Sequence, residues 1–210
     1  MKKSIIFFTL LLTGTVGMQL SACNKKNNVD ADSTLTDSEK QSLAFMIEEE
    51  KMAYDVYTLM YSHWGLTPFQ NIKESESRHM ASVRSLMTRY GVPDPSAGNR
   101  IGAFSNPLIS QLFLQLTAKG DSSELLALTA GAIIEEVDIR DLKEQLLLTN
   151  KQDIRQVYEN LMRGSRNHLR AFVEQLSLKG ITYQPAYLSR DEYDAIINSP
   201  KETGARRNAN

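Results

Sequence analysis

Apolar residues recur every three or four positions along most of this chain, which is the spacing that predicts amphipathic α-helices. No segment shows the alternation of apolar and polar residues that is typical of a half-buried β-strand. Four long helices are therefore predicted, together with two short ones that begin after Asn106 and Ser189. The long helices are expected at about residues 36–64, 67–90, 122–148 and 151–179.

Short sequence signals mark the predicted helix ends. Thr36 and Glu39 form a capping box, and Thr67 followed by Pro68 is predicted to cap the second helix. Tight turns join the first helix to the second and the third to the fourth, whereas a long stretch, residues 91–121, separates the two pairs. The fold class is therefore predicted to be all-α: a four-helix bundle with one long crossover connection that carries a short helix.

The N-terminal segment has the features of a secretory signal. A basic start is followed by a short apolar run and by the residues LSAC, which look like a bacterial lipobox ending at Cys23. A lipid at Cys23 would tether the protein to a membrane of the bacterial cell envelope, outside the cytoplasm. The chain is thus predicted to comprise a lipoprotein signal peptide (1–22), a flexible tether (23–35), a helical domain (36–198) and a disordered tail (199–210).

Cysteine content and charge narrow the range of functions. Cys23 is the only cysteine, so disulfides within the chain and thiolate metal sites are excluded. Removal of residues 1–22 takes away Lys2 and Lys3 but no acid, so the formal charge changes from −1 to −3. This slightly acidic balance predicts no nucleic-acid partner.

Ionisable or polar residues interrupt the apolar stripe near the middle of each long helix. At about 1.5 Å per residue, these interruptions lie at similar heights, roughly 15–27 Å from the nearest tight turn. A buried polar layer of this kind needs compensation, and mixed carboxylate and imidazole ligands suit iron or manganese. The sequence therefore predicts a site for one or two such ions, built from Glu50, Glu76, His79, Glu135 and His168.

The spacing of these residues resembles the ferritin-like di-iron carboxylate superfamily, in which four helices supply glutamates and Glu-x-x-His pairs. More narrowly, the segments EEEKMAYDVY, IIEEVDIRDL and GSRNHLRAF resemble a bacterial ferritin-like family labelled domain of unknown function 2202, over about residues 36–180. The resemblance implies a ferritin-like bundle. It also implies an oxidoreductase that acts on dioxygen or peroxide at a di-iron or di-manganese site.

One position departs from that pattern. The fourth helix carries Ser165-Arg-Asn-His168, so a serine occupies the place where the family resemblance leads us to expect a bridging glutamate. Asp138 lies one turn after Glu135 on nearly the same helical face. Asp138 is therefore the candidate for the missing negative charge.

Neighbouring residues are given structural roles. The acids Glu48, Glu49, Glu74 and Glu136 are expected to face solvent, and His63 is expected near the surface at a helix end. Tyr54 and Tyr57 are interpreted as core aromatics, and the alternatives are that they relay electrons or donate a hydrogen bond to a bridging carboxylate.

Four functions fit these patterns. The leading one is a membrane-tethered metal-dependent oxidoreductase. The alternatives are a metal-binding lipoprotein without turnover, a helical scaffold whose polar layer is held by internal hydrogen bonds, and a partner-binding module of the cell envelope.

Overall fold

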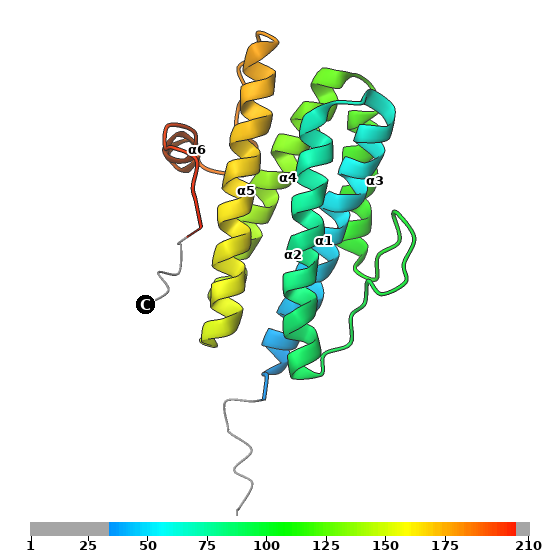
Figure 1. The fold of residues 1–210 in the computed structure, drawn as a ribbon, viewed down its shortest axis with the longest axis vertical. Helices are drawn as coiled ribbons and strands as arrows, with labels where there is room; N and C mark the ends of the chain where they lie inside the picture. The colour runs from blue at the N-terminus through cyan, green and yellow to red at the C-terminus, as the bar shows by residue number, and fades with distance from the viewer. Residues whose placement is uncertain (1–33, 205–210) are drawn as a thin grey trace, which may run out of the picture. The chain divides into compact units, whose positions relative to one another are not determined.

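The structure is a computed structural model that describes residues 34–204, and in this range every regular element is a helix. The elements are α1 (Asp37–Trp64), α2 (Thr67–Tyr90), α3 (Pro107–Gly120), α4 (Glu124–Leu146), α5 (Gln152–Leu178) and α6 (Arg190–Ile197). Figure 1 shows α1, α2, α4 and α5 running along one common direction, and α3 on the crossover packs against α1 and α4. The predicted all-α bundle with one long crossover is confirmed.

Most predicted helix ends are found at the expected residues. The capping box at the start of α1 is present: the Thr36 side chain accepts from Glu39 N at 3.2 Å, and the Glu39 carboxylate accepts from Thr36 N at 2.8 Å. The prediction for α2 is wrong in detail, because Leu66 is the N-cap residue and makes no side-chain bond there. Gly65 adopts φ 65°, a left-handed conformation that favours glycine and permits the tight turn between α1 and α2.

Two apolar clusters fill the bundle. One gathers around Phe69 and Phe172 near the turn between α1 and α2, and the other gathers around Leu43 and Tyr158 toward the opposite end. In α1 the two clusters are separated by residues 48–51, and in α5 by residues 162–168. The predicted polar layer therefore lies between two packed apolar regions, which shield it from water at both ends.

Acids on the outer side of α1 hold the crossover loop. Glu48 is 2% exposed and accepts backbone N–H groups from Ser105 and from Asn106, the latter at 2.8 Å. Asp55 forms an ion pair with Lys51 and accepts from Gly102 N at 3.0 Å. The prediction that Glu48 faces solvent is therefore wrong, because the loop covers this face of α1.

Glu136 likewise holds the segment after α5 by accepting hydrogen bonds from it. Its side chain is fully buried and accepts the hydroxyl of Tyr183 at 2.6 Å and the backbone N–H groups of residues 186–188 at 2.6–2.9 Å. Glu49 is also buried. The predictions that Glu49 and Glu136 face solvent are therefore wrong, whereas Glu74 is exposed as predicted.

The ordered domain extends beyond the predicted limits at both ends. Leu35 is buried against the cluster around Leu43, although it was assigned to the tether. Glu202 pairs with Arg166 and with Arg170 on α5, so this part of the predicted tail contacts the bundle. The predicted signal peptide, Cys23 and residues 205–210 lie outside the described residues.

Candidate metal centre

Five polar side chains from four helices meet between the two apolar clusters. The carboxylates of Glu50 on α1, Glu76 on α2 and Glu135 on α4 are each no more than 2% exposed. The imidazoles of His79 on α2 and His168 on α5 have side-chain exposures of 12% and 11%. Glu76 and His79 point the same way because they are three residues apart on one helix. The structure thus brings together the five residues singled out in the sequence.

The donor atoms form two groups that share Glu76. In the first group, His79 Nδ1 lies 2.7 Å from Glu76 Oε2 and 3.1 Å from Glu50 Oε2. In the second, His168 Nδ1 lies 2.9 Å from Glu76 Oε1 and 3.4 Å from Glu135 Oε2. Each group offers one atom per residue, and these atoms all lie within 4.8 Å of one another. Glu76 therefore directs one carboxylate oxygen toward each histidine.

Several of these buried atoms have no hydrogen-bond partner. Although Glu76 Oε1 and His168 Nδ1 are only 2.9 Å apart, they are not aligned for a hydrogen bond, and neither has another hydrogen-bond partner among the described residues. Glu50 Oε1 is also buried without a partner. Buried polar atoms of folded proteins are normally paired, so such a concentration of polar atoms without hydrogen-bond partners indicates a place for a ligand.

In the absence of a metal ion, the charged groups of the site shift one another's pKa values. Burial raises the pKa of Glu50, and the charge of Asp138 adds to this rise against the opposing effect of His79. Burial and Glu76 likewise raise the pKa of Glu135, against the opposing effect of His168.

The shared carboxylate and the imidazoles show the opposite shifts. Burial opposes ionisation of Glu76, but the two imidazoles outweigh it and hold the pKa of this carboxyl below its usual range. Burial also opposes the charging of His168, but Glu76 and Glu135 outweigh it and raise the pKa of this imidazole to about 10. The pKa of His79 is raised for the same reason, by Glu76 and Glu50 against burial. Without a metal, protons on the imidazoles balance part of the carboxylate charge.

These residues fit divalent transition metals. Three carboxylates and two imidazoles are the donor types that iron and manganese accept, and the described residues offer no thiolate. Two ligand atoms that share one ion at about 2.1 Å stand about 3 Å apart at a right angle. The donor distances of 2.7–3.4 Å within the two groups agree with this expectation.

Tyr57 holds one of the glutamates in place. Its hydroxyl donates to Glu135 Oε1 at 2.5 Å, and the ring packs against Phe69 and Phe172 with centroids 6.0 and 5.4 Å away. Burial and the Glu135 charge raise the pKa of Tyr57 well above its usual value, so the phenol keeps its proton. Tyr57 is thus a core aromatic that also bonds a carboxylate of the site, so the core interpretation and the hydrogen-bonding interpretation both apply.

Asp138 lies beside the five residues but outside both donor groups. It is 6% exposed, and its Oδ2 accepts a hydrogen bond from the Ser165 hydroxyl, while its Oδ1 is buried without a partner. Burial and Glu135 raise the pKa of Asp138 to about 7. The serine that replaces the expected glutamate therefore makes a hydrogen bond to Asp138.

Gly164 on α5 was missed by the sequence analysis. A Cβ atom at this position would lie 2.6 Å from His79 Nε2 and 2.7 Å from His79 Cε1, so only glycine leaves room for the ring as it is placed. The sequence alone did not reveal this requirement, because a glycine within a helix carries no chemical signal of its own. In contrast, His63 is stacked on Trp64 with a half-exposed side chain, as expected of a surface histidine.

Comparison with known proteins places the chain in a family. The family model described as "Uncharacterized protein domain (DUF2202)" matches residues 39–200. The chain belongs to the DUF2202 family. This membership confirms the resemblance to domain of unknown function 2202 that the sequence segments indicated.

A relative of known structure shares the fold. The uncharacterized protein MJ0754 of Methanocaldococcus jannaschii is 49% identical over 173 residues, which cover 82% of this chain and 94% of that protein. The crystal structure of hypothetical protein MJ0754 from Methanococcus jannaschii DSM 2661 matches with a TM-score of 0.78 and covers 80% of this chain and 96% of its own. The fold of this chain is therefore found in a solved structure as well.

Proposed function

We propose that this DUF2202 protein binds two divalent transition-metal ions, iron or manganese, between α1, α2, α4 and α5. The observation that carries the proposal is the pair Glu76 Oε1 and His168 Nδ1, which are 2.9 Å apart, buried and without hydrogen-bond partners. A scaffold held by internal hydrogen bonds would align such a pair. Two atoms that face a common ion have no reason to be aligned with each other.

Each residue has a defined task in this proposal. Glu50 and His79 would hold one ion, Glu135 and His168 would hold the other, and Glu76 would contribute one oxygen to each. Tyr57 fixes the orientation of Glu135 through its hydroxyl. Asp138, whose Oδ1 has no partner, would complete the count of four negative charges against two divalent ions when it is ionised.

Bound iron or manganese would supply redox chemistry toward dioxygen or peroxide, as the ferritin-like resemblance implies. The bundle supports such chemistry by packing apolar clusters against the centre from both ends, which limits the access of water from these directions. The metal-binding protein without turnover is the second candidate. It is favoured by one observation, namely that Ser165 replaces the expected glutamate and Asp138 lies outside both donor groups.

Metal analysis of the purified protein tests the proposal. We expect up to two iron or manganese ions per chain in the wild type, a large loss in His79→Ala, and no loss in the control His63→Ala, because His63 lies outside the site. Consumption of peroxide by the loaded protein separates the oxidoreductase from the second candidate. A wild-type protein that binds no metal when supplied with iron or manganese would contradict both.

The membrane tether is part of the proposal and rests on the LSAC segment before residue 24. Within residues 34–204 no helix has the length and apolar character required to cross a bilayer. Attachment would then depend on lipid at Cys23. We expect Cys23→Ala to move the protein from the membrane fraction to the soluble fraction, and membrane association that persists in this variant would contradict the tether.

A further inference from the structure

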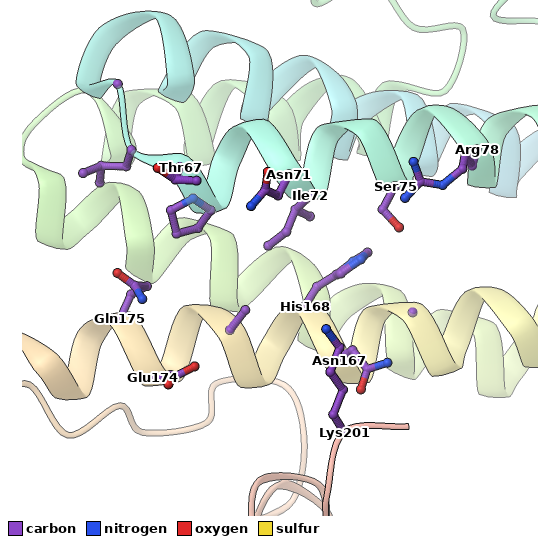
Figure 2. Close-up of a pocket in the computed structure, with 15 residues that line it drawn as sticks. Thr67, Asn71, Ile72, Ser75, Arg78, Asn167, His168, Glu174, Gln175 and Lys201 are labelled. Carbon is purple, nitrogen blue, oxygen red and sulfur yellow. The ribbon is translucent and has the colours of Figure 1, made fainter. Parts of the chain in front are cut away.

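A groove between α2 and α5 opens directly beside the candidate metal centre. Its volume is about 730 Å³, and its walls include His168 and Gly164, the residue against which the His79 ring lies. Figure 2 shows side chains from both helices facing this space, with His168 among them. A space of this size is typical of sites for small organic molecules and far exceeds what dioxygen or peroxide needs.

Small and polar side chains leave the space between the two helices unfilled. On α2 the groove is lined by Asn71 and Ser75, and on α5 by Gly164, Asn167 and Ala171. These residues follow the three- and four-residue spacing of one helical face, where apolar side chains would be expected in a sealed bundle. The sequence thus maintains an open space at this position, next to a buried site.

The two ends of the groove differ in charge. Arg78 and Lys201 lie at the end that contains His168, and neither is paired with an acid within residues 34–204 (Figure 2). Thr67, Glu174 and Gln175 lie toward the other end, near the turn between α1 and α2. Arg78 and Thr67 are separated by about 16 Å along α2. A negative group is therefore favoured at the end that adjoins the metal centre.

The middle of the groove is partly apolar. Ile72 and Ala171 line it there, and Leu66 and Pro68 continue the apolar surface toward the turn. An inorganic anion would leave this surface in contact with water. A molecule with one anionic head and a short hydrocarbon body would match both the cations and the apolar wall.

We propose that the groove between α2 and α5 binds a small organic carboxylate, with its carboxylate at Arg78 and Lys201 and its hydrocarbon body along Ile72 and Ala171. As the assignment of a substrate class, this inference rests on the proposed metal function, because it places the acid beside His168. As the assignment of a binding site, it depends only on the groove and applies to the metal-free protein as well.

Butyrate is a suitable probe, and butyramide is its uncharged control of similar shape. Binding is measured on the full chain in detergent by saturation-transfer NMR and calorimetry, with and without manganese. We expect butyrate to bind at least tenfold more tightly than butyramide and than inorganic phosphate. The double variant Arg78→Gln/Lys201→Gln should weaken butyrate binding at least tenfold and leave the metal content unchanged. Lys73→Gln, a change of an α2 cation outside the groove lining, should leave both unchanged.

The possible outcomes separate this inference from the metal proposal. Butyrate binding that is lost in the double variant supports the groove site, even if the protein were to bind no metal. Metal binding without butyrate binding overturns the groove site and leaves the metal proposal intact. Equal binding of butyramide or phosphate, or butyrate binding that the double variant retains, also overturns the carboxylate assignment.

Discussion

Neighbouring glutamates on the same helices are satisfied in opposite ways. On α4, Glu136 accepts a phenol and three backbone N–H groups, whereas Glu135 next to it receives one phenol hydroxyl and faces a histidine. On α1, Glu48 accepts two backbone N–H groups, whereas Glu50 two residues later has an oxygen without any partner. All four side chains are no more than 2% exposed.

This contrast distinguishes carboxylates that hold the fold from carboxylates that could hold a ligand. A buried carboxylate with several N–H donors is stabilised as an anion within the protein itself. A buried carboxylate without donors must be neutral, or paired with a cation. The anchoring pair Glu48 and Glu136 should therefore control stability. The central acids, Glu50, Glu76 and Glu135, should control metal content. The following predictions test that division.

The largest effect is expected from the carboxylate that both donor groups share. Glu76→Ala should reduce the metal content from two ions per chain toward none, because each group loses one ligand. Metal that binds only the native state adds stability by mass action, about 4 kcal/mol at a thousandfold excess over its dissociation constant. Thermal unfolding with and without chelator should accordingly shift in the wild type and in the control Glu74→Ala, but not in Glu76→Ala. An unchanged metal content in Glu76→Ala would refute the shared position.

The sequence predicted the central acids because they interrupt apolar stripes. Glu50, Glu76 and Glu135 occupy positions where the helical period demands an apolar side chain, so their burial could be inferred. Glu48 and Glu136 lie off those stripes and resembled surface residues. Their burial depends on the crossover loop and on residues 183–188, which approach from far along the chain. Helical periodicity contains no information about such coverage.

The second effect concerns stability alone. Glu136→Ala removes the acceptor for Tyr183 and for three backbone N–H groups, so we expect a loss of about 3–5 kcal/mol in the free energy of unfolding. The metal content of the folded protein should not change. Urea titration followed by metal analysis tests both points, with the exposed Glu144→Ala on the same helix as a control. A variant of normal stability that had lost its metal would reverse our division of roles.

The third effect is the pH dependence of metal affinity. Because the pKa of His168 is about 10 in the metal-free protein, this imidazole is protonated at neutral pH and must release its proton to bind an ion. Metal affinity should rise by roughly tenfold per pH unit for each such proton between pH 6 and 8. Calorimetry in buffers of different ionisation enthalpy would measure the released protons.

The stability of the metal-free protein should fall as the pH rises, whereas metal affinity should rise. The pKa of His168 is raised above its usual 6.5, so its contribution to stability is complete below pH 6.5 and is lost as the pH rises through about 10. The metal-free protein should therefore become less stable between pH 7 and 10. A metal affinity that does not vary between pH 6 and 8 would show that neither histidine releases a proton when an ion binds.

The helices themselves were predictable from local signals, and the errors lie where tertiary contacts decide. The capping box of Thr36 and the stop at Gly65 act within a few residues of sequence, and both were found as predicted. Glu202, in contrast, is ordered by Arg166 and Arg170 on α5, a contact that polar composition alone could not reveal. Gly164 was missed for a similar reason, since its importance depends on a ring that α2 supplies.

The smallest effect compares two glycines that each lie beneath an aromatic ring. A Cβ at Gly164 would approach His79 to 2.6 Å, and a Cβ at Gly131 would approach Phe172 to the same distance. Gly164→Ala should displace the imidazole and lower metal affinity roughly tenfold, as do changes that disturb the orientation of a metal ligand. Its effect on the metal-free fold should be small, because the gain of about 1 kcal/mol in helix propensity offsets the displacement of His79, whose side chain is 12% exposed, whereas Phe172 is fully buried. Gly131→Ala should instead disturb the packing of Phe172 and lower stability while metal affinity is retained. If both variants lost stability alone, the His79 ring would have no special relation to a bound ion, and the central group would behave like the anchoring acids.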